Sequence, residues 1–100
     1  MTATKTITAE SILADYADDI AFVAEEQPAT TVSGFVDQLR TAIRNFGLAR
    51  FDTEELEDAA TYLNDADGST DENERTVLLN RAAEYLKYVD DMADEYRLMV

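Results

Sequence analysis

The residues with the clearest capacity for chemistry lie in the stretch YLNDADGSTDENE, residues 62–74, where carboxylates surround a single glycine. An EF-hand loop binds calcium through oxygen ligands at fixed positions and carries a glycine at the sixth. When Gly68 is aligned with that glycine, acidic side chains fall at the third, fifth, ninth and twelfth positions, which are Asp65, Asp67, Asp71 and Glu74. The stretch is therefore an incomplete candidate for a calcium loop.

The first ligand position of this loop falls on Leu63, whose side chain has no oxygen. Leu63 also continues the apolar face of the helix that we expect before the stretch. Asparagine, aspartate, glycine, serine and threonine are equally the residues that a helix end, a turn and a helix N-cap require. We interpret the stretch as a link between two helices and predict no metal site.

Catalytic groups of the common kinds are missing from the sequence. It contains no cysteine and no histidine, which excludes a thiolate nucleophile, a Ser-His-Asp triad and the Glu-x-x-His ligands of di-metal bundles. Its three glycines are scattered and form no phosphate-binding loop. A carboxylate pair for glycoside hydrolysis fits the composition, but such enzymes need a deep cleft that a small helical domain rarely has. We therefore predict a protein that is not an enzyme and needs no cofactor.

The elements that position the acidic residues are helices. Apolar side chains recur at helical spacing over residues 9–26, 31–46, 53–64 and 72–98. The sequence thus predicts an all-α fold, a compact four-helix bundle with a long C-terminal helix. The 100 residues suit a single domain, in which we expect residues 1–7 to be flexible.

Signals for helix ends accompany this periodicity. Pro28 should end the first helix, because proline disfavours helical geometry in the residue before it. Gly47 should end the second, because glycine commonly follows the last helical residue. The spacing of a capping box occurs before each of the last two helices, in the pairs Asp52–Glu55 and Asp71–Glu74.

The predicted helix over residues 72–98 is long enough to extend beyond the other three. An apolar seam in alternating steps of four and three runs along it through Leu78, Ala82, Tyr85, Val89, Met92, Tyr96 and Met99. In one interpretation this helix packs against the bundle along most of its length. In the other, the end of the seam at Met92, Tyr96 and Met99 pairs with a second copy, giving a homodimer, or with another protein.

The charge of the chain limits its partners. Twenty-two acidic residues against eight basic ones give a formal net charge of −14. Nucleic acid and anionic membranes are poor partners for such a surface, and a protein with a basic surface is a good one. No apolar stretch approaches the roughly 18 residues that a membrane span needs, so we expect a soluble, cytoplasmic protein. Arg40, Arg44 and Arg50 should form ion pairs with acidic neighbours such as Asp37, in preference to an anion site.

Acidic side chains form rows on the predicted helices. Carboxylates at i and i+3 or i+4 stand about 5 to 6 Å apart on a helix. DNA phosphates along one strand have a comparable spacing, with an axial rise of about 3.4 Å per nucleotide. A rigid helix with such a row can therefore occupy a protein groove built for a nucleic-acid backbone. The predicted partner-binding residues are Asp15, Asp18, Asp19, Glu25, Glu26, Asp90, Asp91, Asp94 and Glu95.

In size and composition the sequence resembles phage-encoded counter-defence proteins such as DNA mimics and anti-CRISPR proteins. The resemblance implies an inhibitor that presents its carboxylates to a basic DNA- or RNA-handling protein in the host cytoplasm. One alternative is a helical assembly or adaptor protein that dimerises through the C-terminal helix. The bias toward aspartate, with six arginines and two lysines, is also expected of a halophilic cytoplasm, in which case the acidity answers to salt.

Overall fold

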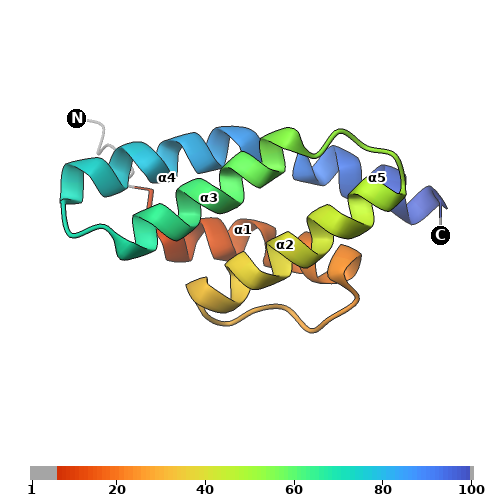
Figure 1. Cartoon of the computed structure of the whole chain (residues 1–100). Helices are drawn as coiled ribbons and strands as arrows, with labels where there is room; N and C mark the ends of the chain where they lie inside the picture. Colours follow the sequence, from red (N-terminus) through yellow and green to blue (C-terminus); the bar gives the residue numbers. More distant parts are fainter. Residues whose placement is uncertain (1–6, 100) are drawn as a thin grey trace, which may run out of the picture.

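A computed structural model describes residues 7–99, which form helices and contain no strand. The helical segments are α1 (Ala9–Ala24), α2 (Val32–Leu48), α3 (Glu54–Gly68), α4 (Glu72–Leu86) and α5 (Val89–Met99) (Figure 1). The last two are one long helix with a bend at Lys87 and Tyr88, so the predicted all-α, four-helix bundle is confirmed. The predicted flexibility of residues 1–7 falls outside the described residues except at Ile7, which packs against the core.

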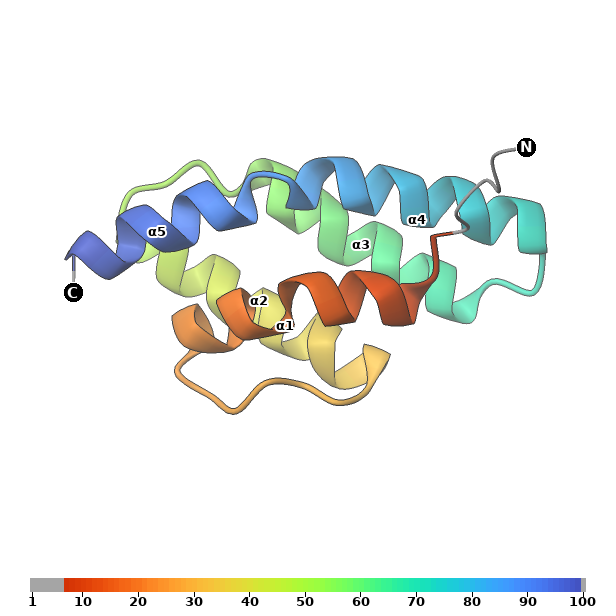
Figure 2. The same ribbon diagram turned by 180° about the vertical axis from the view of Figure 1, so that it is seen from behind.

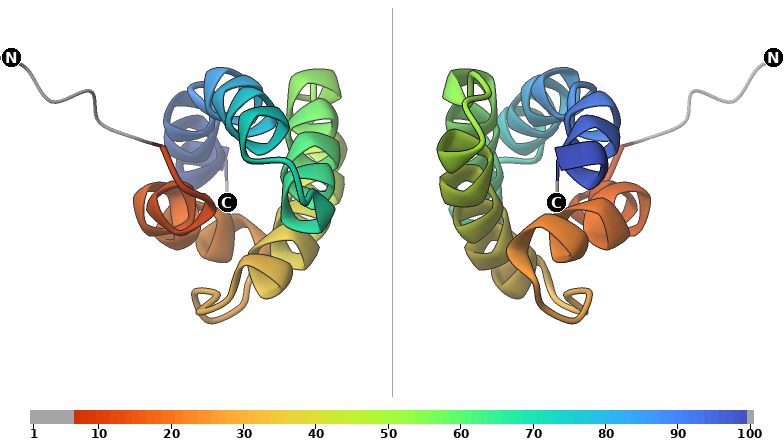
Figure 3. Two further views of the ribbon diagram at one scale, coloured as in Figure 1. Left: turned by 90° about the vertical axis from the view of Figure 1, so that its left-hand side faces the viewer. Right: turned by 90° about the vertical axis from the view of Figure 1, so that its right-hand side faces the viewer.

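The helices do not alternate in direction. Figures 1 and 2 show that α1, α2 and the bent α4–α5 helix run in the same general direction, and that α3 alone returns against them. The chain reaches the start of α2 through residues 25–31, which lead back along α1. Seen from its ends, the bundle is a ring of helices around a single core (Figure 3).

The core is built from the apolar faces that the sequence predicts for the first three helices. In α1, for example, Ile12, Ile20 and Val23 are buried. An aromatic group closes the end of the core at which α2 and α5 finish, where the ring of Phe46 meets other rings edge to face. The largest fully buried side chains are Phe35, Phe46, Ile20, Leu39, Leu56, Leu63, Leu86, Val23 and Val89.

The connector over residues 25–31 is tied to α2 by buried amides. The side chain of Gln38 donates to the carbonyl of Gln27 and accepts from the backbone N–H of Ala29 at 3.1 Å. Farther along α2, the Asn45 amide donates to the carbonyl of Val23 at 2.7 Å. Because partly buried backbone groups need hydrogen-bond partners, Gln38 stabilises the connector, and Asn45 ties α2 to the end of α1.

Two predicted helix ends are wrong in detail. α1 ends at Ala24, before Pro28, and Glu25 takes up the left-handed conformation with φ of 60°. Gly47 does not stop α2, which continues to Leu48, and the left-handed residue that follows is Arg50 with φ of 72°. In both places a non-glycine residue adopts the geometry for which glycine is favoured, because backbone hydrogen bonds and packing fix it there.

The two predicted capping boxes differ in outcome. Asp71 caps α4, with its Oδ1 accepting the N–H groups of Asn73 at 2.9 Å and Glu74 at 3.2 Å. The first box is wrong: α3 starts at Glu54, and the Asp52 Oδ1 accepts only the Glu54 N–H, at 3.1 Å. α3 also continues past its predicted end at residue 64 as far as Gly68.

The buried stripe of the C-terminal helix shares Ala82 and Val89 with the predicted seam and elsewhere uses the residue that follows a seam position. Its buried residues are Leu79, Ala82, Leu86, Val89 and Ala93, whereas Leu78, Tyr85 and Met92 lie half-buried at its edges. This buried stripe keeps heptad spacing through the bend, while the packing partner changes: α4 packs mainly on α3 and α5 mainly on α1.

Candidate functional site

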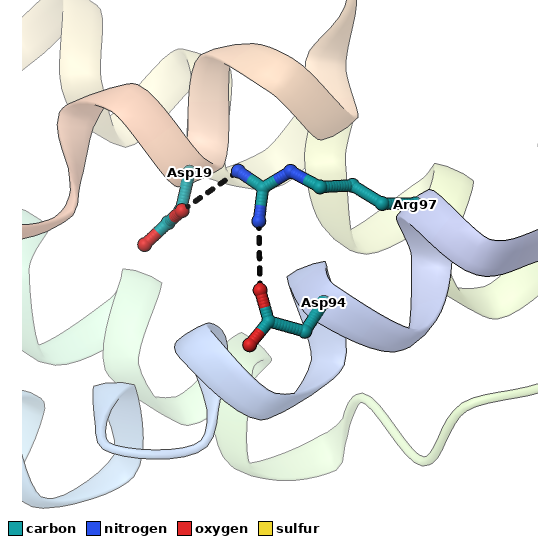
Figure 4. Close-up of polar contacts among 3 residues, drawn as sticks. All are labelled: Asp19, Asp94 and Arg97. Atoms are coloured by element: carbon teal, nitrogen blue, oxygen red, sulfur yellow. Dashed lines mark hydrogen bonds and ion pairs between the residues drawn. The ribbon is translucent and has the colours of Figure 1, made fainter.

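The packing of α5 beside α1 brings together acidic residues that lie far apart in the sequence. Arg97 on α5 bridges them: its Nη2 lies 3.1 Å from Oδ1 of Asp19 on α1, and its Nη1 lies 2.9 Å from Oδ1 of Asp94 (Figure 4). One guanidinium therefore serves two carboxylates from different helices, a geometry that suits its planar fork of donors.

The Arg97 guanidinium packs on the first of three aromatic rings that contact one another. The Arg97 guanidinium carbon lies 4.6 Å from the centre of the Phe22 ring, within the range of a cation–π contact. The Phe22 ring meets Tyr96 edge to face at 6.1 Å, and Tyr96 in turn meets Phe46 at 5.9 Å. The ion pair at the surface is thus connected through a cation–π contact and two edge-to-face contacts to the aromatic end of the core.

Carboxylates along the same seam affect one another. A side-chain hydrogen bond with Asp19 raises the pKa of Asp90 above its usual range, and partial burial and nearby aspartates raise it further. The pKa of Tyr16 is also raised, first by burial and then by the negative charges of Asp90 and Asp15. Neighbouring negative charges thus add to both shifts, after the hydrogen bond in Asp90 and after burial in Tyr16.

The predicted partner-binding acids separate into groups. We call five acids of α1 and α5 the α1–α5 acidic face. Asp19, Asp90 and Asp94 meet where the two helices pack, and Asp15 lies beside them near Tyr16. The fifth, Asp18, is exposed on α1 one helical turn after Asp15. Glu95 stands one turn from Met92, on another side of α5, and Asp91 stands one turn from both Tyr88 and Asp94, between the two sides. Glu25 and Glu26 follow α1 at the start of the connector and are exposed.

The predicted oligomer seam does not form one exposed surface. Tyr96 is turned inward between Phe22 and Phe46, and Met92 packs against the core. Only Met99 is mostly exposed, at 59%. The sequence reasoning missed two more exposed apolar residues at this end of the bundle, Leu98 at 87% and Leu48 at 79%. Both residues lie at the end of a helix, and this position in the sequence could have indicated their exposure.

The candidate calcium loop is not formed. Asp65 and Asp67 lie within α3, where residues two apart point in different directions, and Asp71 is occupied in capping α4. Within residues 7–99, no cluster of three or more acidic side chains is arranged to hold a metal ion.

The arginines of the second helix do not neutralise the acids as predicted. Among the described residues the ion pairs within 4 Å are those of Arg97 alone, so the expected pair of Asp37 with Arg40 is wrong. Arg40, Arg44 and Arg50 are exposed on α2 and the loop after it. The carboxylates therefore keep most of their charge at the surface.

Comparisons with protein-family models, with curated proteins and with solved structures find no match to this chain. None of the helices in the described part of the chain is long and apolar enough to cross a membrane.

Proposed function

We propose that this protein is a non-enzymatic binding protein whose α1–α5 acidic face docks on the basic surface of a partner protein. The observation that carries the proposal is the side-by-side packing of α1 and α5, which joins two separate acidic rows into one surface. Arg97 is the one cation paired with these acids among residues 7–99. The surface thus keeps a strong negative potential that attracts a basic partner.

The partner class that this surface fits is a protein that handles DNA or RNA. Asp15 and Asp19 stand one helical turn apart, about 5 to 6 Å, which approaches the spacing of phosphates along a nucleic-acid strand. The surrounding helices share a packed core, so binding requires no ordering of the backbone that carries these carboxylates. The protein would then act as an inhibitor that occupies a nucleic-acid groove, as the likeness to phage counter-defence proteins implies.

The test is capture of a partner from native host extract, followed by competition with a short DNA duplex. Asp15→Lys combined with Asp18→Lys reverses two exposed charges and leaves the Asp19–Arg97 ion pair in place. We expect this variant to bind the captured partner at least about tenfold more weakly, with DNA displacing the wild type.

A matched control applies the same charge change elsewhere. Asp58→Lys with Asp65→Lys alters two exposed positions on the outer side of α3. Equal binding by the two double variants would show that only net charge matters and would remove the α1–α5 acidic face as the site. Partner binding that DNA does not reduce would remove the nucleic-acid mimic.

A second candidate function is assembly through the end of the bundle. Leu98 and Met99 close α5 and are exposed, as is Leu48 at the end of α2. Exposed apolar side chains of this size are typical of contact sites when they gather. Leu98→Asp with Met99→Asp should convert a dimer to a monomer in sedimentation experiments. A wild-type protein that stays monomeric at millimolar concentration would remove this candidate.

A further inference from the structure

The bend between α4 and α5 opens a cavity of about 230 Å³ against the loop that precedes α3. Figures 1 and 2 show this loop and the bend side by side. The cavity is lined by Phe51, Asp52, Glu55, Leu56, Tyr88 and Met92. None of these lining residues belongs to the α1–α5 acidic face.

The floor of this cavity is apolar and fixed by the core. Leu56 is fully buried, and the ring of Phe51 is held edge to face against Phe46 at a centroid distance of 5.7 Å. Met92 packs against the same core from α5. Tyr88, in contrast, is 55% exposed at the bend, so one aromatic ring belongs to the floor and another is free at the edge.

The rim of the cavity is acidic. Asp52 and Glu55 lie on the α3 bank, and the N–H of Glu54 orients the Asp52 carboxylate through its Oδ1. On the opposite bank, Asp91 and Glu95 of α5 stand one helical turn from the lining residues Tyr88 and Met92. No lysine or arginine lines the cavity. An apolar, aromatic floor beneath carboxylates is complementary to a cation with an apolar stem.

We propose that this cavity binds an arginine side chain of the basic partner protein. Its volume is below the roughly 300 to 1,000 Å³ of pockets for drug-sized ligands and suits a single side chain. A guanidinium can stack on an aromatic ring while its planar fork of donors reaches a carboxylate, which a lysine ammonium cannot match. The chain uses the same combination internally, where Arg97 lies over Phe22 and pairs with Asp19.

This proposal rests on the proposed function, because the arginine belongs to the same basic partner. It adds a second contact, on a different side of α5 from the α1–α5 acidic face. Long-range attraction by the acids brings the partner near, whereas a defined pocket selects one side chain and sets the register of binding.

The test uses a hexa-arginine peptide and a hexa-lysine peptide as probes. Methyl-labelled methionine gives three NMR signals, from Met1, Met92 and Met99. We expect hexa-arginine to shift the Met92 methyl signal, and to bind more tightly than hexa-lysine in calorimetry. Loss of the ring in Tyr88→Leu, or of the charge in Glu55→Gln, should weaken hexa-arginine binding about fivefold.

Glu57→Gln is the matched control, because it removes one exposed carboxylate from the far side of the same helix. It should change the affinity less than about twofold, since it alters only the long-range field. Circular dichroism confirms that each variant is folded. Equal effects of Glu55→Gln and Glu57→Gln, or a Met92 signal that hexa-arginine leaves in place, would overturn the pocket.

The captured partner separates this proposal from the proposed function. If Tyr88→Leu weakens partner binding and Asp15→Lys with Asp18→Lys does not, the pocket stands and the α1–α5 acidic face fails. If only the aspartate reversals weaken it, the acidic face stands and the pocket is overturned. A wild-type dimer that Tyr88→Leu dissociates would place a second copy in the pocket, and this result also overturns the proposal.

Discussion

Arg97 and Asp19 are 78 residues apart in the sequence and 3.1 Å apart in the structure. Among residues 7–99 they form the one ion pair that joins two different helices. The contact lies over Phe22, so the same arginine also covers an aromatic ring that is part of the α1–α5 seam. Arg97 therefore holds α5 against α1 and also keeps acids of the two helices close together.

Arg97→Ala should lower the free energy of unfolding by about 1 kcal/mol, because it removes a partly exposed ion pair and a cation–π contact. Urea unfolding followed by circular dichroism measures this. Asp94→Asn is the control: Asp94 is 75% exposed and pairs within its own helix, so its loss should cost less than about 0.5 kcal/mol. If Arg97→Ala lost no more stability than Asp94→Asn, the contacts of Arg97 with α1 would contribute nothing to stability.

Gln38→Leu should destabilise the protein by about 2 to 3 kcal/mol, because it leaves the Gln27 carbonyl and the Ala29 N–H without a buried partner. Hydrogen exchange should show faster exchange of the Ala29 amide. Gln27→Ala removes an exposed side chain and keeps the backbone carbonyl, so it should have little effect. Unchanged exchange at Ala29 in Gln38→Leu would contradict the role of this amide.

The raised pKa of Asp90 predicts a pH dependence of stability. The folded state takes up the Asp90 proton at a higher pH than the unfolded state does, so this group stabilises the fold as pH falls. Its contribution is complete below the ordinary pKa of 3.8 and is lost as pH rises through the raised folded value. Asp90→Asn should therefore flatten this part of the stability profile. The charge of Asp91 is the last of the causes that raise this pKa, so Asp91→Asn should flatten the profile less than Asp90→Asn does.

Low concentrations of salt should already stabilise this protein. The net charge of −14 gives repulsion that few ion pairs offset, and the screening length falls from about 30 Å at 0.01 M to about 10 Å at 0.1 M salt. We expect most of the rise in the urea midpoint below about 0.2 M potassium chloride, with full helicity in dilute buffer. Helicity that appears only in molar salt would instead favour the halophilic explanation of the acidity.

Local chemistry is what the sequence determined by itself. The helices and their buried faces follow from apolar periodicity, because helical spacing places apolar residues such as Ile20 and Leu39 on the side of the helix that faces the core. The cap at Asp71 was equally readable, because its hydrogen bonds span three residues. The missing histidines and cysteines and the large negative charge needed no structure at all.

Relations between distant residues were decided by the tertiary structure. The connector that lets α1 and α2 run in the same direction is bonded by Gln38, which lies nine to eleven residues away. The C-terminal helix packs on α3 before the bend at Lys87 and Tyr88 and on α1 after it, and this change of partner cannot be read from the periodicity of the helix itself. Hence the pairing of Arg97 with Asp19, and the cavity beside Tyr88, arise only when separate helices pack, because burial of a shared core sets which surfaces meet.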